Sequence, residues 1–292
     1  MNNNILIIGG SSFLGVNLVE KIISSPNTIG ITYFKGSLVN ILNLELLYNK
    51  KIKTHYLDIL NISQNDIDCI VSEYDIIINC IGQVSKPIGN CFNINSLGII
   101  KIIESISKLN KKLIHISTVG VYGTVNEANE SSKLMPESPY SISKAMAEIL
   151  IINKLHEKQY CILRLSNLYG NKQEKGILSY LLKSALSDKV LNFDNNGELV
   201  RYFLDIEDCA SIISLAIENK LSGIFNLRGD EMYNIKELVS LFELKFNIKY
   251  NAFFSNQLPI DNTQNISNDK IKSTISFHFK NNIKKLINYY IV

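Results

Sequence analysis

The sequence predicts an α/β fold in which helices cover both faces of a doubly wound parallel sheet, followed by a smaller C-terminal lobe. Compact apolar runs of strand length alternate with segments of helical length through the first two-thirds of the chain. A glycine-rich turn follows the first apolar run. After about residue 166 the segments become shorter and irregular, which predicts domains over residues 1–165 and 166–292, with some later segments returning to the first domain.

Six apolar runs bounded by polar residues have the length of buried strands. Three further segments have the length and apolar content of helices. Parallel strands joined by helical crossovers explain this alternation. The expected strands cover residues 4–8, 28–34, 55–57, 75–80, 113–117 and 161–165, and the expected helices cover residues 13–23, 95–109 and 140–155.

Composition argues against several classes of protein. The 292 residues are 46% hydrophobic and 20% charged, and the net charge of +3 is too small to indicate nucleic-acid binding. No signal peptide is recognisable, and no apolar run approaches the about 18 residues of a membrane span. Five cysteines without a Cys-x-x-Cys pair and four scattered histidines predict a reducing cytoplasm and no metal site.

Gly9-Gly-Ser-Ser-Phe-Leu-Gly15 lies where the first strand passes into a helix. Backbone N–H groups and the helix dipole hold a pyrophosphate at such a position, although a tight strand–helix turn is the plainer explanation. Ser12 replaces the middle glycine of the motif Gly-x-x-Gly-x-x-Gly and adds a hydroxyl donor. Ser11, Phe13 and Leu14 complete the expected cofactor-binding turn.

The end of the second strand bears on the choice of cofactor. Folds that bind NAD usually place an acid there to accept from the ribose 2′-hydroxyl. The chain reads Gly30-Ile-Thr-Tyr-Phe-Lys-Gly36, without an acid. Lys35 can pair with a 2′-phosphate, unless it is only a solvated loop lysine. We therefore place Tyr33 and Lys35 at the cofactor and expect NADP(H) to be favoured over NAD(H).

Tyr140 and Lys144 lie four residues apart in Ser138-Pro-Tyr-Ser-Ile-Ser-Lys144. On a helix such a pair projects from one face. The lysine charge favours the phenolate, so the pair predicts a proton donor whose pKa lies below the usual value of about 10. The pair gains weight from its order in the chain, because the glycine turn and Thr118, ahead of Val121-Tyr-Gly123, precede it.

In this order the motifs resemble those of the extended short-chain dehydrogenase/reductases, the NAD-dependent epimerase/dehydratase family that modifies nucleotide sugars. The resemblance covers nearly the whole chain and implies a Rossmann-type sheet with a C-terminal substrate-binding lobe. Its further segments are Leu57-Asp-Ile59, Ile78-Asn-Cys-Ile-Gly-Gln83, Asn95-Ser-Leu-Gly98, His115-Ile-Ser-Thr-Val-Gly-Val-Tyr-Gly123, Leu163-Arg-Leu-Ser-Asn-Leu-Tyr-Gly170 and Val200-Arg-Tyr-Phe-Leu-Asp-Ile-Glu-Asp208.

The resemblance implies a role for each matching residue. Thr118 would hydrogen-bond the substrate oxygen, Tyr140 would be the general acid/base, and Lys144 would hold the nicotinamide ribose. Arg201 would bind the diphosphate, unless it is a surface arginine paired with a neighbouring glutamate. Further expected cofactor contacts are Asp58, Ile59, Cys80, Ile81, Gly82 and Asn95, and further expected substrate contacts are Gln83 and Asn167.

Two departures from the family pattern carry information. The family's sugar 4,6-dehydratases place Asp-Glu directly after the catalytic threonine, where this chain has Val119 and Gly120. Neither side chain moves a proton, so dehydration is disfavoured. The second diphosphate arginine that the family often supplies is missing near Leu258-Pro-Ile-Asp261, so lysines bind the diphosphate or the substrate is not a nucleotide sugar.

Together these residues predict an NAD(P)-dependent reductase of the 4-keto reductase type, acting on a nucleotide-linked deoxysugar. The missing acid favours a reductase because a consumed cofactor is commonly NADPH. A nucleotide-sugar epimerase with tightly held NAD is the alternative, and a non-catalytic dinucleotide-binding regulatory protein is a distant one. We also expect a homodimer formed through residues 95–109 and 140–155, where Ile99, Ile102, Ile103 and Ile106 suit either a dimer contact or core packing.

Overall fold

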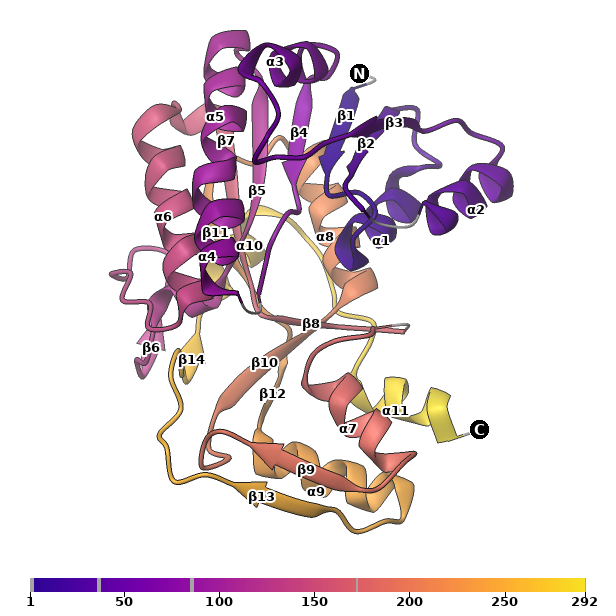
Figure 1. Cartoon of the computed structure of the whole chain (residues 1–292), viewed down its shortest axis with the longest axis vertical. Coiled ribbons are helices and arrows are strands. Elements are labelled where there is room, and N and C mark those ends of the chain that lie inside the picture. Colours follow the sequence, from indigo (N-terminus) through magenta and orange to yellow (C-terminus); the bar gives the residue numbers. More distant parts are fainter. Residues whose placement is uncertain (1–2, 36–37, 85–86, 172, 292) are drawn as a thin grey trace.

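The computed structural model describes residues 3–35, 38–84, 87–171 and 173–291, and its larger part is built on a seven-stranded parallel sheet (Figure 1). The strand order is β11-β7-β5-β4-β1-β2-β3. The chain adds β2 and β3 on one side of β1 and then adds β4 on the other side, as in doubly wound nucleotide-binding sheets. The predicted fold class is therefore confirmed. The strands are β1 (Asn4–Ile8), β2 (Thr28–Tyr33), β3 (Lys53–Tyr56), β4 (Ile76–Asn79), β5 (Lys112–Thr118), β7 (Tyr160–Leu165) and β11 (Gly223–Leu227).

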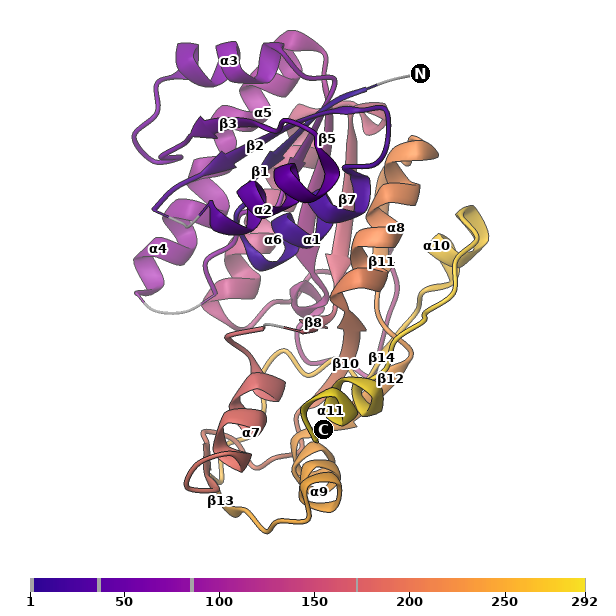
Figure 2. The same cartoon turned by 90° about the vertical axis from the view of Figure 1, so that its right-hand side faces the viewer.

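Helices cover both faces of this sheet (Figures 1 and 2). One face carries α3 (Gln64–Ser72), α5 (Gly98–Leu109) and α6 (Pro139–Lys154). The other carries α1 (Phe13–Ile22) and α8 (Ile206–Glu218), with α2 (Val39–Tyr48) beside α1. None of the described helices combines the length and apolarity needed to cross a membrane.

The sequence of β1 explains why both faces need a cover. Successive strand residues point to opposite faces of a sheet. Ile5 and Ile7 pack into the core beneath α1 and α8, whereas Leu6 and Ile8 pack into the core beneath α3, α5 and α6. A strand buried on both sides must be apolar throughout, which is why it reads as an uninterrupted apolar run.

The helix that leads into α5 contains a π-helical turn. It begins with α4 (Ile88–Phe92), passes through the π turn Asn93–Leu97, and continues as α5. Ile99, Ile102, Ile103 and Ile106 are at most 2% exposed and pack on the sheet. Of the two uses considered for these four residues, core packing is the one that the structure shows.

The second lobe has a core of its own, below the sheet in Figure 1. Phe203, Phe242, Leu181 and Ile283 lie at its centre, where helices pack against short strands. The three-stranded sheet of this lobe has the order β12-β10-β8, and a separate pair is β13-β9. Its elements are β8 (Asn167–Tyr169), α7 (Ile177–Ala185), β9 (Val190–Phe193), β10 (Val200–Asp205), β12 (Glu231–Asn234), α9 (Ile235–Phe246), β13 (Asn251–Phe254) and α11 (Ile283–Ile291).

The chain returns from the second lobe to the first near its C-terminal end. There β14 (Asn265–Ile266) pairs in parallel with β6 (Glu127–Ala128), a short strand between β5 and α6. Helix α10 (Asp269–Thr274) then packs beside β11 through the buried Ile271. The loop that contains β6 is thus held by a segment from the far end of the sequence.

Candidate active site

A cleft of about 930 Å³ lies between the carboxyl ends of the sheet strands and the second lobe. In open α/β sheets ligands bind at these strand ends. The cleft brings together four of the residues singled out from the sequence. Thr118, Tyr140, Asn167 and Arg201 all line it.

Thr118 and Tyr140 enter the cleft from β5 and α6 of the first domain. Thr118 is the last residue of β5, and its Oγ1 accepts from the Gly120 N–H at 3.2 Å, which starts a tight 3-10 turn. Tyr140 is the second residue of α6. Ser138 caps this helix by accepting from the Ser141 N–H at 3.1 Å, and Pro139 begins it, an arrangement that sets the start of a helix firmly.

Lys144 lies one turn further along α6 and is only 2% exposed. Its ammonium donates to the carbonyl oxygens of Ile81 and Ile116, at 3.0 and 2.9 Å. Burial lowers the pKa of Lys144 to about 8. A β-carbon built at Gly82 would lie 3.5 Å from Lys144 Nζ and 4.0 Å from the Tyr140 hydroxyl, so both polar groups converge on Gly82.

The expectation that Lys144 lowers the pKa of Tyr140 is wrong for this structure. Tyr140 borders the cleft, and burial of the phenol raises its pKa to about 12. The ammonium is directed at two backbone carbonyls, and its own charge is disfavoured by burial. Tyr140 is therefore protonated at neutral pH, which is the state of a proton donor.

Asn95 connects the expected cofactor segment to helix α6. It lies in the π turn, a feature that often marks a functional position. Its side chain accepts from the Gln83 N–H at 2.8 Å and donates to the Gln83 carbonyl at 2.9 Å. It also donates to Ser143 Oγ at 3.0 Å. The backbone of Gln83 is thus fixed one residue after Gly82. Neither Ser143 nor this connection was identified from the sequence.

The glycine turn has the geometry of an anion-binding helix start. A β-carbon at Gly15 would lie 2.4 Å from the Gly9 carbonyl oxygen, so only glycine allows α1 to begin this close to β1. Ser12 caps α1 by accepting from the Gly15 N–H at 3.1 Å. The N–H groups of Phe13 and Leu14 have no acceptor within the helix, because they belong to its first turn. The residues present therefore fit a pyrophosphate.

The ends of β2 and β3 bring Lys35 near an acid. Lys35 is exposed and adopts the left-handed backbone conformation, with φ 51°. Its Nζ lies over the Phe34 ring, 4.9 Å from the ring centre. Asp58 follows β3, and hydrogen bonds from Asn61 together with the charge of Lys35 lower the pKa of its carboxyl. Lys35 therefore lies close to the acid that follows the third strand. Gly36 lies outside the described residues.

The other expected cofactor residues surround this end of the sheet. Tyr33 stacks edge-on against Tyr56, with ring centres 5.8 Å apart. Ile59 is buried against the start of α5, where a β-carbon at Gly98 would lie 3.1 Å from it. Cys80 directly follows β4, and burial raises the pKa of its thiol to about 12, so it remains a neutral thiol.

Arg201 lies on β10 and reaches the cleft from the second lobe. Its Nη1 donates to the carbonyl oxygens of Val200 and Asp261, both at 3.0 Å. Burial lowers the pKa of Arg201 to about 10, so the guanidinium stays charged at neutral pH. Among the described residues it makes no ion pair with a glutamate, so the alternative of a surface arginine paired with Glu198 or Glu207 is wrong.

The other two arginines have structural partners. Arg228 stacks over Tyr202 at 4.4 Å and donates to the Ile266 carbonyl. Arg164 is 2% exposed and forms a buried ion pair with Glu148 at 2.7 Å. Of the three arginines in the sequence, Arg201 is thus the one that lines the cleft.

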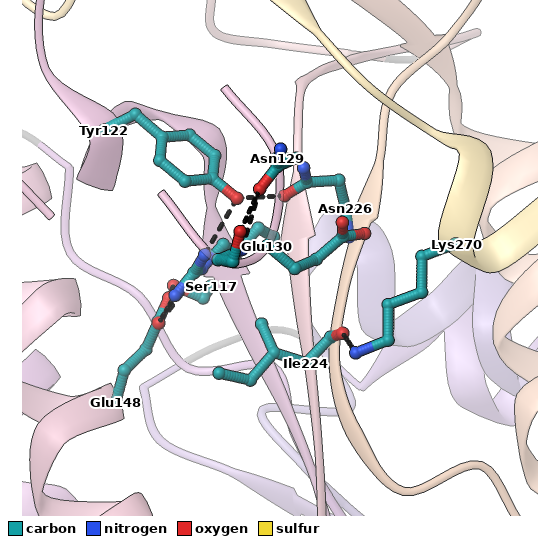
Figure 3. Close-up of polar contacts among 10 residues, drawn as sticks. Ser117, Tyr122, Asn129, Glu130, Glu148, Ile224, Asn226 and Lys270 are labelled. Atoms are coloured by element: carbon teal, nitrogen blue, oxygen red, sulfur yellow. Dashed lines mark hydrogen bonds and ion pairs between the residues drawn. The ribbon is translucent and has the colours of Figure 1, made fainter. Parts of the chain in front are cut away.

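A buried polar network adjoins the cleft through Ser117, and Figure 3 shows members of this network. Glu148 accepts from Ser117 Oγ as well as from Arg164. Arg164 Nη1 donates to the Tyr122 hydroxyl at 2.8 Å, and that hydroxyl donates to Asn226 Oδ1 at 2.6 Å. Ser117 precedes Thr118 directly, so the network joins α6, β5, β7 and β11 below the predicted catalytic residues.

Gly120 occupies one of the positions where the dehydratases carry an acid. A β-carbon there would lie 2.4 Å from Ser141 Oγ. That hydroxyl cannot move freely, because it donates to Asp261 Oδ2 at 2.7 Å. The residue at 120 is small because Ser141 fills the space. Nothing in the local sequence connects Ser141 with Asp261, since 120 positions separate them.

Comparisons with known proteins show what this chain is similar to. The chain is 28% identical over 262 residues to a putative UDP-glucose 4-epimerase of Methanocaldococcus jannaschii, covering 86% of this chain and 85% of that protein. It is 29% identical over 268 residues to a dTDP-D-glucose 4,6-dehydratase of Dictyostelium discoideum, covering 77% and 58%.

The fold matches that of the UDP-glucuronic acid 4-epimerase from Bacillus cereus, solved in complex with UDP-glucuronic acid and NAD. The TM-score is 0.86 at 22% identity, over 99% of this chain and 98% of that one. The sequence profile of the NAD dependent epimerase/dehydratase family matches residues 5–234, and the chain therefore belongs to that family.

Proposed function

We propose that this protein is a nucleotide-sugar oxidoreductase of the 4-epimerase type, which uses a nicotinamide dinucleotide to oxidise and re-reduce one sugar carbon. The observation that carries the proposal is the convergence of Thr118 and Tyr140 from the first domain with Arg201 from the second on one cleft. Two of the proteins compared above are 4-epimerases by name, which supports this choice.

The dinucleotide, when bound, supplies the hydride acceptor and donor. The first turn of α1 would hold its pyrophosphate, and Lys144 would hold the nicotinamide ribose. Tyr140 exchanges a proton with the sugar oxygen at the reacting carbon, and Thr118 donates a hydrogen bond to the same oxygen. Arg201 binds the diphosphate through Nε and Nη2, because its two hydrogen bonds to described residues are made by Nη1.

A 4-keto reductase is the second candidate, favoured by two observations. The raised pKa of Tyr140 keeps the phenol protonated, as a reduction requires of its acid, whereas an epimerase also needs a base for the first half-reaction. The end of β2 carries Lys35 and no acid of its own, which suits NADPH, although Asp58 lies near.

Dehydration is disfavoured in either case. A 4,6-dehydratase of this family needs the acid pair that Val119 and Gly120 replace. An acid at position 120 would displace Ser141 from its bond to Asp261. The dehydratase relative does not alter this argument, because the family contains both activities.

We further propose a homodimer located in the cytoplasm. Leu97, Met146, Ile149 and Ile152 are 40–55% exposed on adjoining helical segments, and three of them repeat every third residue along α6. A reducing compartment suits the five free cysteines.

Light scattering of the protein at micromolar concentration should report twice the chain mass, and Ile149→Lys should shift the measured mass toward that of the monomer. A monomeric wild type would remove the dimer proposal.

Tyr140→Phe should lower turnover by about 10²–10⁴-fold, because the variant loses the proton donor and keeps the ring. Cofactor binding and the melting temperature should stay near those of the wild type. Tyr48→Phe, on the exposed α2, is the matched control and should have no effect. Wild-type turnover in Tyr140→Phe on an accepted substrate would exclude Tyr140 as the donor.

The cofactor distinguishes the two candidates. An epimerase should co-purify with NAD, released on denaturation, whereas a reductase should be empty and turn over NADPH. If NADPH is the cofactor, it should bind more tightly than NADH, and Lys35→Ala should weaken NADPH alone by about two- to fivefold. Lys51→Ala, another exposed lysine, is the control. Equal affinities for both cofactors would remove the argument from β2.

Arg201→Ala should weaken binding of UDP or dTDP by about 10- to 100-fold, because charge-assisted hydrogen bonds to phosphate are lost. The Michaelis constant for a sugar nucleotide should rise equally, with cofactor affinity unchanged. Arg201→Lys should recover only part of the loss, because an ammonium cannot bind bidentately. Calorimetry measures the diphosphate affinity directly, and unchanged affinity in Arg201→Ala would contradict the diphosphate assignment.

A further inference from the structure

Asp261 is a buried acid in the segment that passes from the second lobe back toward β14. It is 7% exposed and adopts the left-handed backbone conformation, with φ 50°. Aspartate visits this region more readily than most residues, at a cost that surrounding contacts must offset. Those contacts come from the start of α6.

The carboxylate of Asp261 accepts hydrogen bonds from residues that precede and follow Tyr140 in the sequence. Oδ1 accepts from the Glu137 N–H at 2.7 Å, and Oδ2 accepts from the Ser138 N–H at 3.2 Å. Oδ2 also accepts from Ser141 Oγ at 2.7 Å. In return the Asp261 N–H donates to Glu137 Oε2 at 2.6 Å.

The same residue contacts the arginine of the second lobe. Its carbonyl oxygen accepts from Arg201 Nη1 at 3.0 Å. The following residues reinforce the connection on both sides of the cleft. Asn262 Oδ1 accepts from the Val200 N–H at 2.9 Å, and Thr263 Oγ1 donates to the Gly123 carbonyl at 2.8 Å.

The chemistry of these contacts requires a carboxylate. Three donors share its two oxygens, and an asparagine would offer one oxygen and turn an NH₂ donor toward the other donors. Negative charge at the start of a helix is also favoured by the helix dipole. Burying the charge without these bonds would be costly. The buried carboxylate of Asp261 therefore fixes the first turn of α6.

We propose that Asp261 is a positioning residue that sets the start of α6, and with it Tyr140, relative to Arg201. Through Asp261, binding of a substrate diphosphate to Arg201 stabilises the start of α6, the helix that carries the proton donor. The inference rests on the proposed function, since it assigns Arg201 to the diphosphate and Tyr140 to proton transfer. Ser141 is the hydroxyl through which Asp261 acts, and Gly120 leaves it room.

The first test needs no turnover. Amide hydrogen exchange of the full-length protein is followed at residues 137–143 with and without UDP. In the wild type UDP should slow exchange at this helix start. In Asp261→Asn that protection should be lost, while UDP affinity, carried by Arg201 and the Asp261 backbone carbonyl, stays within about threefold.

The second test uses the reaction. Asp261→Asn should lower kcat by about 10- to 100-fold with little change in the Michaelis constant, because a small displacement of the acid costs rate more than binding. If Asp261→Asn fails to fold, Ser141→Ala replaces it in this test. Ser141→Ala removes only one of the contacts to Asp261 and should also lower kcat. Asp66→Asn is the control. Asp66 Oδ2 also accepts a hydrogen bond from a serine hydroxyl at a helix start, that of Ser63 at 2.7 Å before α3.

The outcomes separate the two proposals. Failure of the wild type to bind either UDP or dTDP would overturn the proposed nucleotide-sugar substrate. UDP binding with equal protection of α6 in wild type and Asp261→Asn would overturn the positioning role alone. So would a loss of kcat no greater than that of Asp66→Asn, or a raised Michaelis constant with kcat unchanged.

Discussion

The ion pair between Glu148 and Arg164 is the interaction on which the arrangement of the cleft depends. Both groups are almost fully buried, so their charges are tolerated only because each satisfies the other and the remaining bonds go to Ser117 and Tyr122. Such a pair adds little net stability compared with an apolar contact, but removing one partner costs about 3–5 kcal/mol. Its value here is geometric, since it attaches α6 to β7 in a single orientation.

Helix α6 is therefore held at three heights along its length. Asp261 holds its first turn, Asn95 holds Ser143 one turn later, and Arg164 holds Glu148 beyond that. The partners come from the second lobe, the π turn and the sheet respectively. Lys144 lies among them and donates to the two carbonyl groups beside it. A helix with so many independent attachments provides a rigid reference for groups that must meet a substrate at fixed distances.

Much of the fold could be predicted from the sequence because buried parallel strands read as apolar runs. The first strand was predicted with its bounds, and the other five predicted strands differ by one or two residues at their ends. Helices α2, α3 and α8 and strand β11 were not predicted individually. In α2 apolar residues occur all around the helix, which hides the helical period, and β11 belongs to the first sheet only through tertiary pairing.

The candidate site divides in the same way. Thr118, Tyr140, Asn167 and Arg201 could be predicted to act together because their motifs occur in a recognisable order, and they do line one cleft. The pKa of Tyr140 was misjudged because spacing along a helix says nothing about burial. Asp261 was missed because its partners are distant in sequence. Hydrogen bonds between remote segments leave no local pattern from which to predict them.

The order of elements along the chain has a consequence for how the protein can be assembled. Strand β11 and helix α8 follow the first strands of the second lobe, yet they complete the sheet beside β7 and cover α1. A chain interrupted after β7 would leave that strand as an unpaired sheet edge and leave apolar side chains of α1 facing water. Exposed edges of this kind pair with other chains. The first domain is thus protected from aggregation only once the chain has been synthesised through β11, when β8, α7, β9 and β10 of the second lobe have also been made.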